Sequence, residues 1–98
     1  MRVLVPVREK SGEESIVCNV GDAGSFALLE LGEGMEIVQI DFRDDFSDEL
    51  FDYIVTSDKN DDIDEAFELG ARALLARPGM SIEEIVEAMM FRELDEIA

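Results

Sequence analysis

Short apolar runs alternate with polar, turn-forming segments along the chain. The first run, Arg2 to Val7 (RVLVPV), is rich in β-branched residues and is apolar on both faces. Such a run is typical of a central strand that is buried on both sides. Because Pro6 cannot donate a backbone hydrogen bond, we expect the strand to end close to this residue.

The next two apolar runs predict a β-hairpin. Ser25 to Leu31 (SFALLEL) and Met35 to Phe42 (MEIVQIDF) both have the composition of strands, and a turn with two glycines, Gly32 and Gly34, separates them. A strand, a short glycine turn and a second strand form the usual signature of a hairpin.

The second half of the chain alternates strands with helices. Tyr53 to Thr56 (YIVT) predicts a short buried strand. Ala71 to Ala76 (ARALLA) predicts another, because the run is short and is bracketed by Gly70 and Pro78. A hairpin followed by alternating strands and helices predicts one α/β domain, residues 1–98, in which helices pack on a mixed sheet.

Two helices are predicted in this half. The segment SDKNDDIDEAFELG, residues 57–70, predicts a helix that buries Ile63 and Phe67 and ends at Gly70. Ser81 and Glu84 form the capping box of a last helix. Apolar residues then recur at helical spacing to the end of the chain, at Ile82, Ile85, Val86, Met89, Met90, Leu94 and Ile97. The Met pair would either fill the core or form a partner-binding face.

The charge balance determines which partners are expected. The 98 residues include 25 acidic and 8 basic ones, for a formal net charge of −17. A surface with this many acidic residues repels phosphate backbones and anionic lipids. We therefore expect neither nucleic acid nor a membrane as partner. A basic protein partner, a bound cation or high ionic strength would each account for the charge. No apolar run has transmembrane length, and MRVLVPV is too short for a signal peptide, so we expect a cytoplasmic protein.

The inventory of reactive side chains is small. One cysteine and no histidine exclude an internal disulfide, a cysteine-only zinc site and every histidine-based catalytic pair or metal site. No nucleophile stands beside a base in the sequence, so we expect no enzymatic activity. One acidic stretch could support acid–base catalysis or magnesium binding, but only if its carboxylates lie together in a cleft. These residues are Asp41, Asp44, Asp45, Asp48 and Asp52.

A second acidic stretch resembles the beginning of a calcium-binding loop. Its alternate oxygen-bearing residues are Asp58, Asn60, Asp62 and Asp64. The copy fails at Ile63, where such a loop needs glycine, and at Leu69, where it needs glutamate. Acidic residues before a helix, stabilised by its dipole, explain the stretch better, and calcium binding is the alternative.

The segment Ser15 to Phe26 (SIVCNVGDAGSF) contains the single cysteine, Cys18. Its small-residue turn, Gly21 to Gly24, leads into a strand and carries no lysine, so a phosphate-binding loop is not predicted. No cationic residue adjoins Cys18 to lower its pKa. The thiol would be either a small apolar filler or a soft-metal ligand, and one thiolate cannot hold a cluster alone.

In order and spacing, these motifs resemble the dinitrogenase iron–molybdenum cofactor-binding family, the NifX- and NafY-like group. Val5-Pro6-Val7 matches the V-P-V that ends the family's first strand. Gly21, Ala23 and Phe26 match the last part of its loop S-x-H-F-G-x-A-x-x-F. The later segments FDYIVTS, ELGARALLARPGMSIEEIVEAMM and FRELDEI match the family's following strands, final helix and ending.

The resemblance implies a ribonuclease H-like three-layer fold, with a five-stranded mixed sheet and helices packed on it. It also implies binding or carriage of the iron–molybdenum cofactor or of an iron–sulfur cluster, near Cys18–Ala23 and the loop after Thr56. Cys18 would be the metal ligand. The cofactor-binding residues would be Cys18, Asn19, Gly21, Asp22, Ala23 and Gly24.

The chain departs from the family at two places. Asn19 stands where the family has histidine, and amide side chains are poor iron ligands. The middle region is shortened to RDDFSDELF. Two functions therefore stay open. The first is a non-catalytic cluster carrier that meets a cluster donor or acceptor. The second is an interaction module, monomeric or homodimeric, that has lost the cluster and binds a basic protein.

Overall fold

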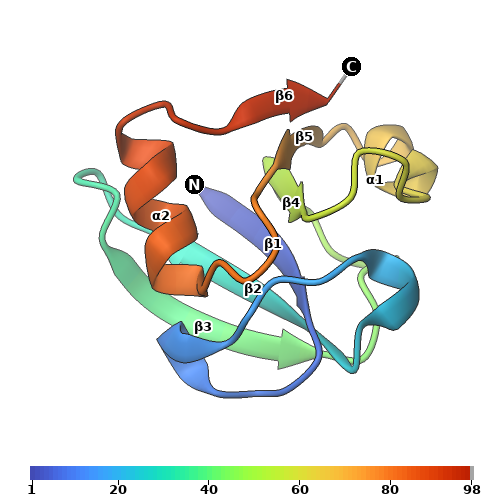
Figure 1. Ribbon diagram of the computed structural model, residues 1–98, viewed down its shortest axis with the longest axis horizontal. Coiled ribbons are helices and arrows are strands. Elements are labelled where there is room, and N and C mark those ends of the chain that lie inside the picture. The colour runs from blue at the N-terminus through green and yellow to red at the C-terminus, as the bar shows by residue number, and fades with distance from the viewer. Residues whose placement is uncertain (98) are drawn as a thin grey trace.

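The computed structural model describes residues 1–97 and contains one mixed sheet of six strands, in the order β3-β2-β1-β4-β5-β6 (Figure 1). The hairpin β2–β3 and strand β1 pair antiparallel, β1, β4 and β5 pair parallel, and β6 returns antiparallel to β5. The strands are β1 (Arg2–Val7), β2 (Ser25–Leu31), β3 (Ile37–Arg43), β4 (Tyr53–Thr56), β5 (Arg72–Leu75) and β6 (Asp95–Ile97).

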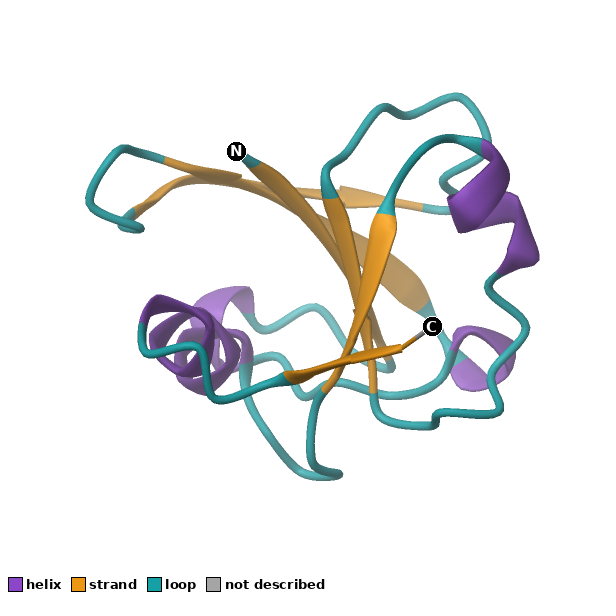
Figure 2. Cartoon of the chain, turned by 90° about the horizontal axis from the view of Figure 1, so that it is seen from above, coloured by secondary structure: helices purple, strands orange, loops and turns teal. Residues whose placement is uncertain are grey.

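Helices cover both faces of the sheet (Figure 2). Helix α2 (Ile82–Met90) and the 3-10 turn η1 (Gly12–Glu14) contact each other on one face. Helix α1 (Asp64–Glu68) and the 3-10 turn η2 (Val20–Asp22) pack on the other face. No helix within residues 1–97 is both long and apolar enough to cross a bilayer. The predicted α/β fold with helices on a mixed sheet is confirmed.

Strand β1 lies at the centre of two hydrophobic cores. Its odd-numbered residues, Val3, Val5 and Val7, point into the core beneath α2, whereas Leu4 points into the core on the opposite face. This alternation follows from the period of two in a strand, and it explains why the run is apolar throughout. The prediction of a central strand buried on both faces is confirmed.

The expected count of five strands is wrong, because the last helix ends earlier than its apolar spacing suggests. Helix α2 ends at Met90, and the chain leaves it through Arg92, whose φ is 55°. Glu93 N–H donates to Ala88 O at 2.8 Å and Arg92 N–H to Met89 O at 3.1 Å, which is the bonding pattern of a Schellman motif. The residues after this stop form β6. The ribonuclease H-like assignment stays a prediction.

The helix predicted over residues 57–70 is much shorter than expected. Only Asp64–Glu68 is helical, and the acidic residues before it form turns. Ile63 and Ala66 are buried, but Phe67 is 39 % exposed, so its predicted burial is wrong. Gly70 ends the helix with φ of 90°, as the sequence predicts.

Candidate functional site

The segment Cys18–Gly24, called the Cys18 loop below, is fastened to the end of β1. Cys18 N–H donates to Pro6 O at 2.9 Å, and Gly24 N–H donates to Val7 O at 2.9 Å. Strand β4 pairs with β1 only at Val3 and Leu4, so the loop occupies the place beside β1 that β4 leaves open.

Gly24 is required by this close approach. A Cβ atom at position 24 would lie 2.3 Å from the carbonyl oxygen of Arg8, which is far inside van der Waals contact. Gly21 has open space around its Cα, so a side chain would fit at that position. Gly24 is therefore needed for the close packing of the loop against β1, and its N–H group already donates to Val7 O.

Asn19 acts as a cap within the loop. Its Oδ1 accepts a hydrogen bond from Asp22 N–H at 2.9 Å and begins the turn η2. Asp22 in turn lies 3.3 Å from the guanidinium of Arg8, at the surface. The side chains of Asn19 and Asp22, which the resemblance places in the cofactor site, are thus both engaged in holding the loop.

Cys18 lies inside the protein, with 5 % of its surface exposed. Burial raises the pKa of the Cys18 thiol above its ordinary value of 9.0, Arg8 opposes this change, and the carboxylates of Asp22 and Asp61 add to it. A buried thiol with a raised pKa is protonated at neutral pH, and the protonated form is neither a good nucleophile nor a metal ligand.

Asp61 joins the Cys18 loop to the end of β4. Its Oδ2 accepts a hydrogen bond from Val20 N–H at 2.7 Å and another from the hydroxyl of Thr56 at 2.6 Å, and Thr56 is fully buried. The structure therefore brings together the two loops that the family resemblance places around a ligand. The sequence gives no signal for Asp61 itself, because it is one of several neighbouring acids and only the fold selects which one turns inward.

The residues present do not fit a metal–sulfur cluster held by this chain. Within residues 1–97, no three side chains of His, Cys, Asp or Glu are grouped closely enough to hold a metal ion. Cys18 offers one buried thiol, and the nearest ionisable groups include two carboxylates that disfavour both its thiolate and a further anion. A cluster needs several thiolate ligands.

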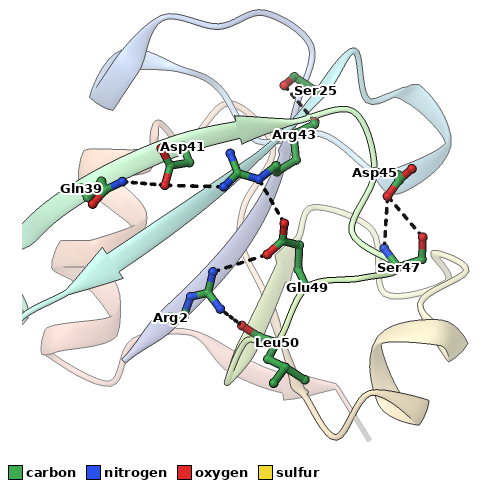
Figure 3. A network of polar contacts seen from close by, with 9 residues as sticks. All are labelled: Arg2, Ser25, Gln39, Asp41, Arg43, Asp45, Ser47, Glu49 and Leu50. Atoms are coloured by element: carbon green, nitrogen blue, oxygen red, sulfur yellow. Dashed lines mark hydrogen bonds and ion pairs between the residues drawn. The ribbon is translucent and has the colours of Figure 1, made fainter.

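The acidic side chains proposed as an alternative do not converge either. Asp41 accepts from the amide of Gln39 at 2.7 Å, and Asp45 contacts Ser47 (Figure 3). Asp52 accepts from Arg2 N–H at 2.8 Å. In the second acidic stretch, Asp58 Oδ1 accepts from Asn60 N–H at 2.9 Å, which is a local turn. These carboxylates stabilise loops and strand ends.

Three solved structures share this fold at low sequence identity. No family model matches the chain, and no curated protein matches it in sequence. A "putative dinitrogenase" from Methanocaldococcus jannaschii is 14 % identical, over 100 % of this chain and 95 % of that one, with a TM-score of 0.74. The protein PH0822 is 18 % identical, over 98 % and 96 % of the two chains, with a TM-score of 0.72. A "putative NifB protein" from Thermotoga, assigned to the DUF35 family, is 18 % identical, over 97 % and 91 %, with a TM-score of 0.67.

The likenesses extend over almost the whole of each chain, so the protein is a small α/β domain of the same architecture as these three structures.

Proposed function

We propose that this chain is a small, non-catalytic protein-interaction domain that keeps the fold of the carrier family and has lost the cluster. Two observations support the proposal: its fold is shared with proteins named for dinitrogenase and NifB, and its motifs resemble those of the iron–molybdenum cofactor-binding family. The chain has no histidine and its single thiol is buried, so it offers no Ser–His or Cys–His pair, which is consistent with a non-catalytic role.

The partner we infer is another protein. The observation that argues against a cluster is the position of Asp61, whose carboxylate already accepts the Val20 N–H and the Thr56 hydroxyl. These donors face each other across the two loops and are already satisfied by the chain's own anion. The proposed domain therefore keeps the carrier fold and the loop shape, and has lost the cluster.

The charge distribution supports a basic partner. Four of the eight basic residues, Arg2, Arg8, Arg43 and Arg72, lie within ion-pair distance of carboxylates of the same chain. Within residues 1–97, most of the 25 acidic residues have no such cation, and the net charge of −17 makes the surface potential negative. Such a surface attracts a basic protein at low salt.

Anaerobic reconstitution tests the loss of the cluster. The full chain and its Cys18→Ser variant would be incubated with iron and sulfide, desalted, and measured for visible absorption and for bound iron. We expect no cluster band and no retained iron in either protein. A stable band in the natural chain that disappears in Cys18→Ser would contradict the proposal and would support the cluster-carrier function instead.

Chemical cross-linking in cell extract tests the basic partner. We expect a cross-linked protein of basic composition at about 0.05 M salt. The cross-link should be lost at about 0.5 M, because salt shortens the range of electrostatic attraction. Capture that does not change with salt would argue against a partner selected by charge.

A further inference from the structure

We infer that a basic segment of a partner protein docks in an apolar groove beside the end of α2, called the methionine groove below. The inference rests on the proposed function, because it gives the basic partner of that proposal a place to bind. Arg92, Glu96 and six apolar residues line the groove. The apolar residues are Met1, Met35, Tyr53, Leu74, Met89 and Leu94.

The methionine groove lies between the last turn of α2, strand β6 and the turn that joins β2 to β3 (Figure 1). Its volume is about 350 Å³, which is large enough for a few side chains of a partner. Met35, Met89 and Leu94 are half-buried and pack against the core beneath α2. The groove is therefore a place where the edge of this core is open to solvent.

Methionine gives the groove an adaptable apolar lining. Three of the five methionines of the chain line it, and flexible, polarisable side chains of this kind can repack around different apolar partners. The structure also separates the Met pair of α2. Met89 lines the groove, whereas Met90 lies outside it and is 46 % exposed. The first of the two methionines is thus placed for a partner.

Two residues of the groove have a strained backbone. Met35 has φ of 63° and Arg92 has φ of 55°, and within residues 1–97 these are the non-glycine residues with positive φ. Glycine would adopt both conformations without the cost of about 1 kcal/mol that a Cβ atom adds. Side chains that are kept at such positions in one groove support a binding role for that groove.

An acidic hollow adjoins the methionine groove. Its charged lining residues are Glu84, Glu87, Glu93 and Arg77. The hydrogen bond that ends α2, from Glu93 N–H to Ala88 O at 2.8 Å, joins two residues of this hollow. The residues that follow these two in the sequence, Met89 and Leu94, line the groove. The groove and the hollow therefore lie on either side of the end of α2.

Charge complementarity determines the occupant. Within residues 1–97, Glu87 and Glu93 lie within ion-pair distance of no cation. Arg92 and Glu96 carry opposite charges, so the groove itself adds no net charge. A partner segment with an apolar side chain in the groove can place a neighbouring lysine or arginine at the hollow. A second copy of this chain is disfavoured, because each copy has a net charge of −17.

Tryptophan fluorescence tests the groove, because the chain contains no tryptophan. The probe is a short lysine–leucine peptide with one tryptophan among its leucines, and the matched peptide has glutamine in place of each leucine. At about 0.05 M salt we expect the natural chain to shift the emission of the first peptide to shorter wavelength and to leave the second unchanged. Met89→Gln should weaken binding about tenfold, because it places an amide in an apolar contact.

Met90→Gln is the matched control. It makes the same change one residue further along α2, outside the groove, and should leave the affinity unchanged. Met35→Gln tests the groove from the hairpin turn, should Met89→Gln not fold, and circular dichroism reports the folding of all three variants. Equal affinities of the Met89→Gln and Met90→Gln chains, or equal binding of the two peptides, would overturn the inference.

Glu87→Gln tests the acidic hollow. It should lower the affinity for the lysine–leucine peptide about threefold at about 0.05 M salt and have little effect at about 0.5 M. Glu68→Gln is the control, because it removes an exposed carboxylate from α1 on the other face of the sheet. An equal loss of affinity in both variants would show attraction by net charge alone and would overturn the inference.

The failure of the inference can be distinguished from the failure of the proposed function. A salt-sensitive cross-link to a basic protein that Met89→Gln does not weaken would support the proposed function and overturn the groove. The absence of any cross-linked protein, with the peptide results as expected, would count against the proposed function only. Sedimentation of the chain alone tests the other occupant, and we expect a monomer. A dimer that dissociates in Met89→Gln would mean that a second copy fills the groove, and would overturn the inference.

Discussion

Gly24 and Asp61 hold the Cys18 loop from two sides. Gly24 allows the loop to pass against the backbone of Arg8, and Asp61 binds it to the end of β4 through Val20 and Thr56. The loop is thus held in place without a ligand, and the anchor formed by the Asp61 side chain can be removed by a single substitution.

Replacing Asp61 by alanine should destabilise the protein. The buried hydroxyl of Thr56 and the N–H of Val20 would lose their acceptor, and the expected cost is about 1–3 kcal/mol in the free energy of unfolding. Asp61→Asn should cost less, because an amide oxygen still accepts. Urea denaturation would measure both. Asp62→Ala, at the exposed neighbouring residue, is the control and should change stability by less than about 0.5 kcal/mol. An equal effect of the two alanine variants would contradict this role of Asp61.

The thiol of Cys18 should make stability depend on alkaline pH. Because burial raises its pKa in the folded protein, the folded state keeps the proton more tightly than the unfolded state does. The resulting stabilisation is present below the ordinary thiol pKa of 9.0 and is lost as the pH rises above it. Urea denaturation between pH 7 and pH 11 should show a steeper fall for the natural chain than for Cys18→Ala. Parallel curves would show that the thiol titrates alike in both states.

Helices α1 and α2 end with the same hydrogen-bond pattern but with different residues. In α1 the left-handed position is Gly70, with Ala71 N–H donating to Ala66 O at 3.0 Å. In α2 the equivalent position is Arg92. Glycine adopts this conformation without strain, whereas a residue with a Cβ does so at a cost of about 1 kcal/mol or more.

Single substitutions of Gly70 and Arg92 should change the free energy of unfolding in opposite directions. Gly70→Ala should destabilise the protein by about 1 kcal/mol, and Arg92→Gly should stabilise it by up to about 1 kcal/mol. Thermal denaturation of both variants would measure the changes. A loss of stability in Arg92→Gly would show that the arginine side chain contributes more than its backbone strain costs.

Some elements of this fold could be predicted from the sequence, and others could not. The centre of the sheet was predictable, because a strand buried on both faces requires an apolar run such as Arg2–Val7. The capping box at Ser81 was also predictable, and Ser81 Oγ accepts from Glu84 N–H at 3.2 Å. Strand β6 was not, because Arg92 gives no sign of a helix stop, and Leu94 and Ile97 continue the helical spacing. The position of Asp61 depends on contacts between distant segments, which no local pattern contains.

The net charge of −17 should make the stability of the whole protein depend on salt. Repulsion among the acidic residues is greatest in the compact state, so screening favours folding. We expect the midpoint of thermal unfolding to rise between about 0.05 M and 1 M sodium chloride. Glu68→Gln together with Glu87→Gln, which removes two exposed carboxylates from the last turns of α1 and α2, should reduce this rise. A midpoint that does not change with salt would mean that local ion pairs offset the repulsion.

The central position of β1 has a consequence for how the chain folds. One neighbour, β2, follows β1 closely in sequence, whereas the other, β4, pairs Tyr53 with Val3 across a loop of some fifty residues. Closing the longer loop costs more chain entropy, so the three-stranded unit β1–β3 should form before β4 docks against it. Pulse-labelling hydrogen exchange during refolding should therefore protect the amides of β2 earlier than those of β5, and in that interval the open side of β1 is exposed to pairing with other chains.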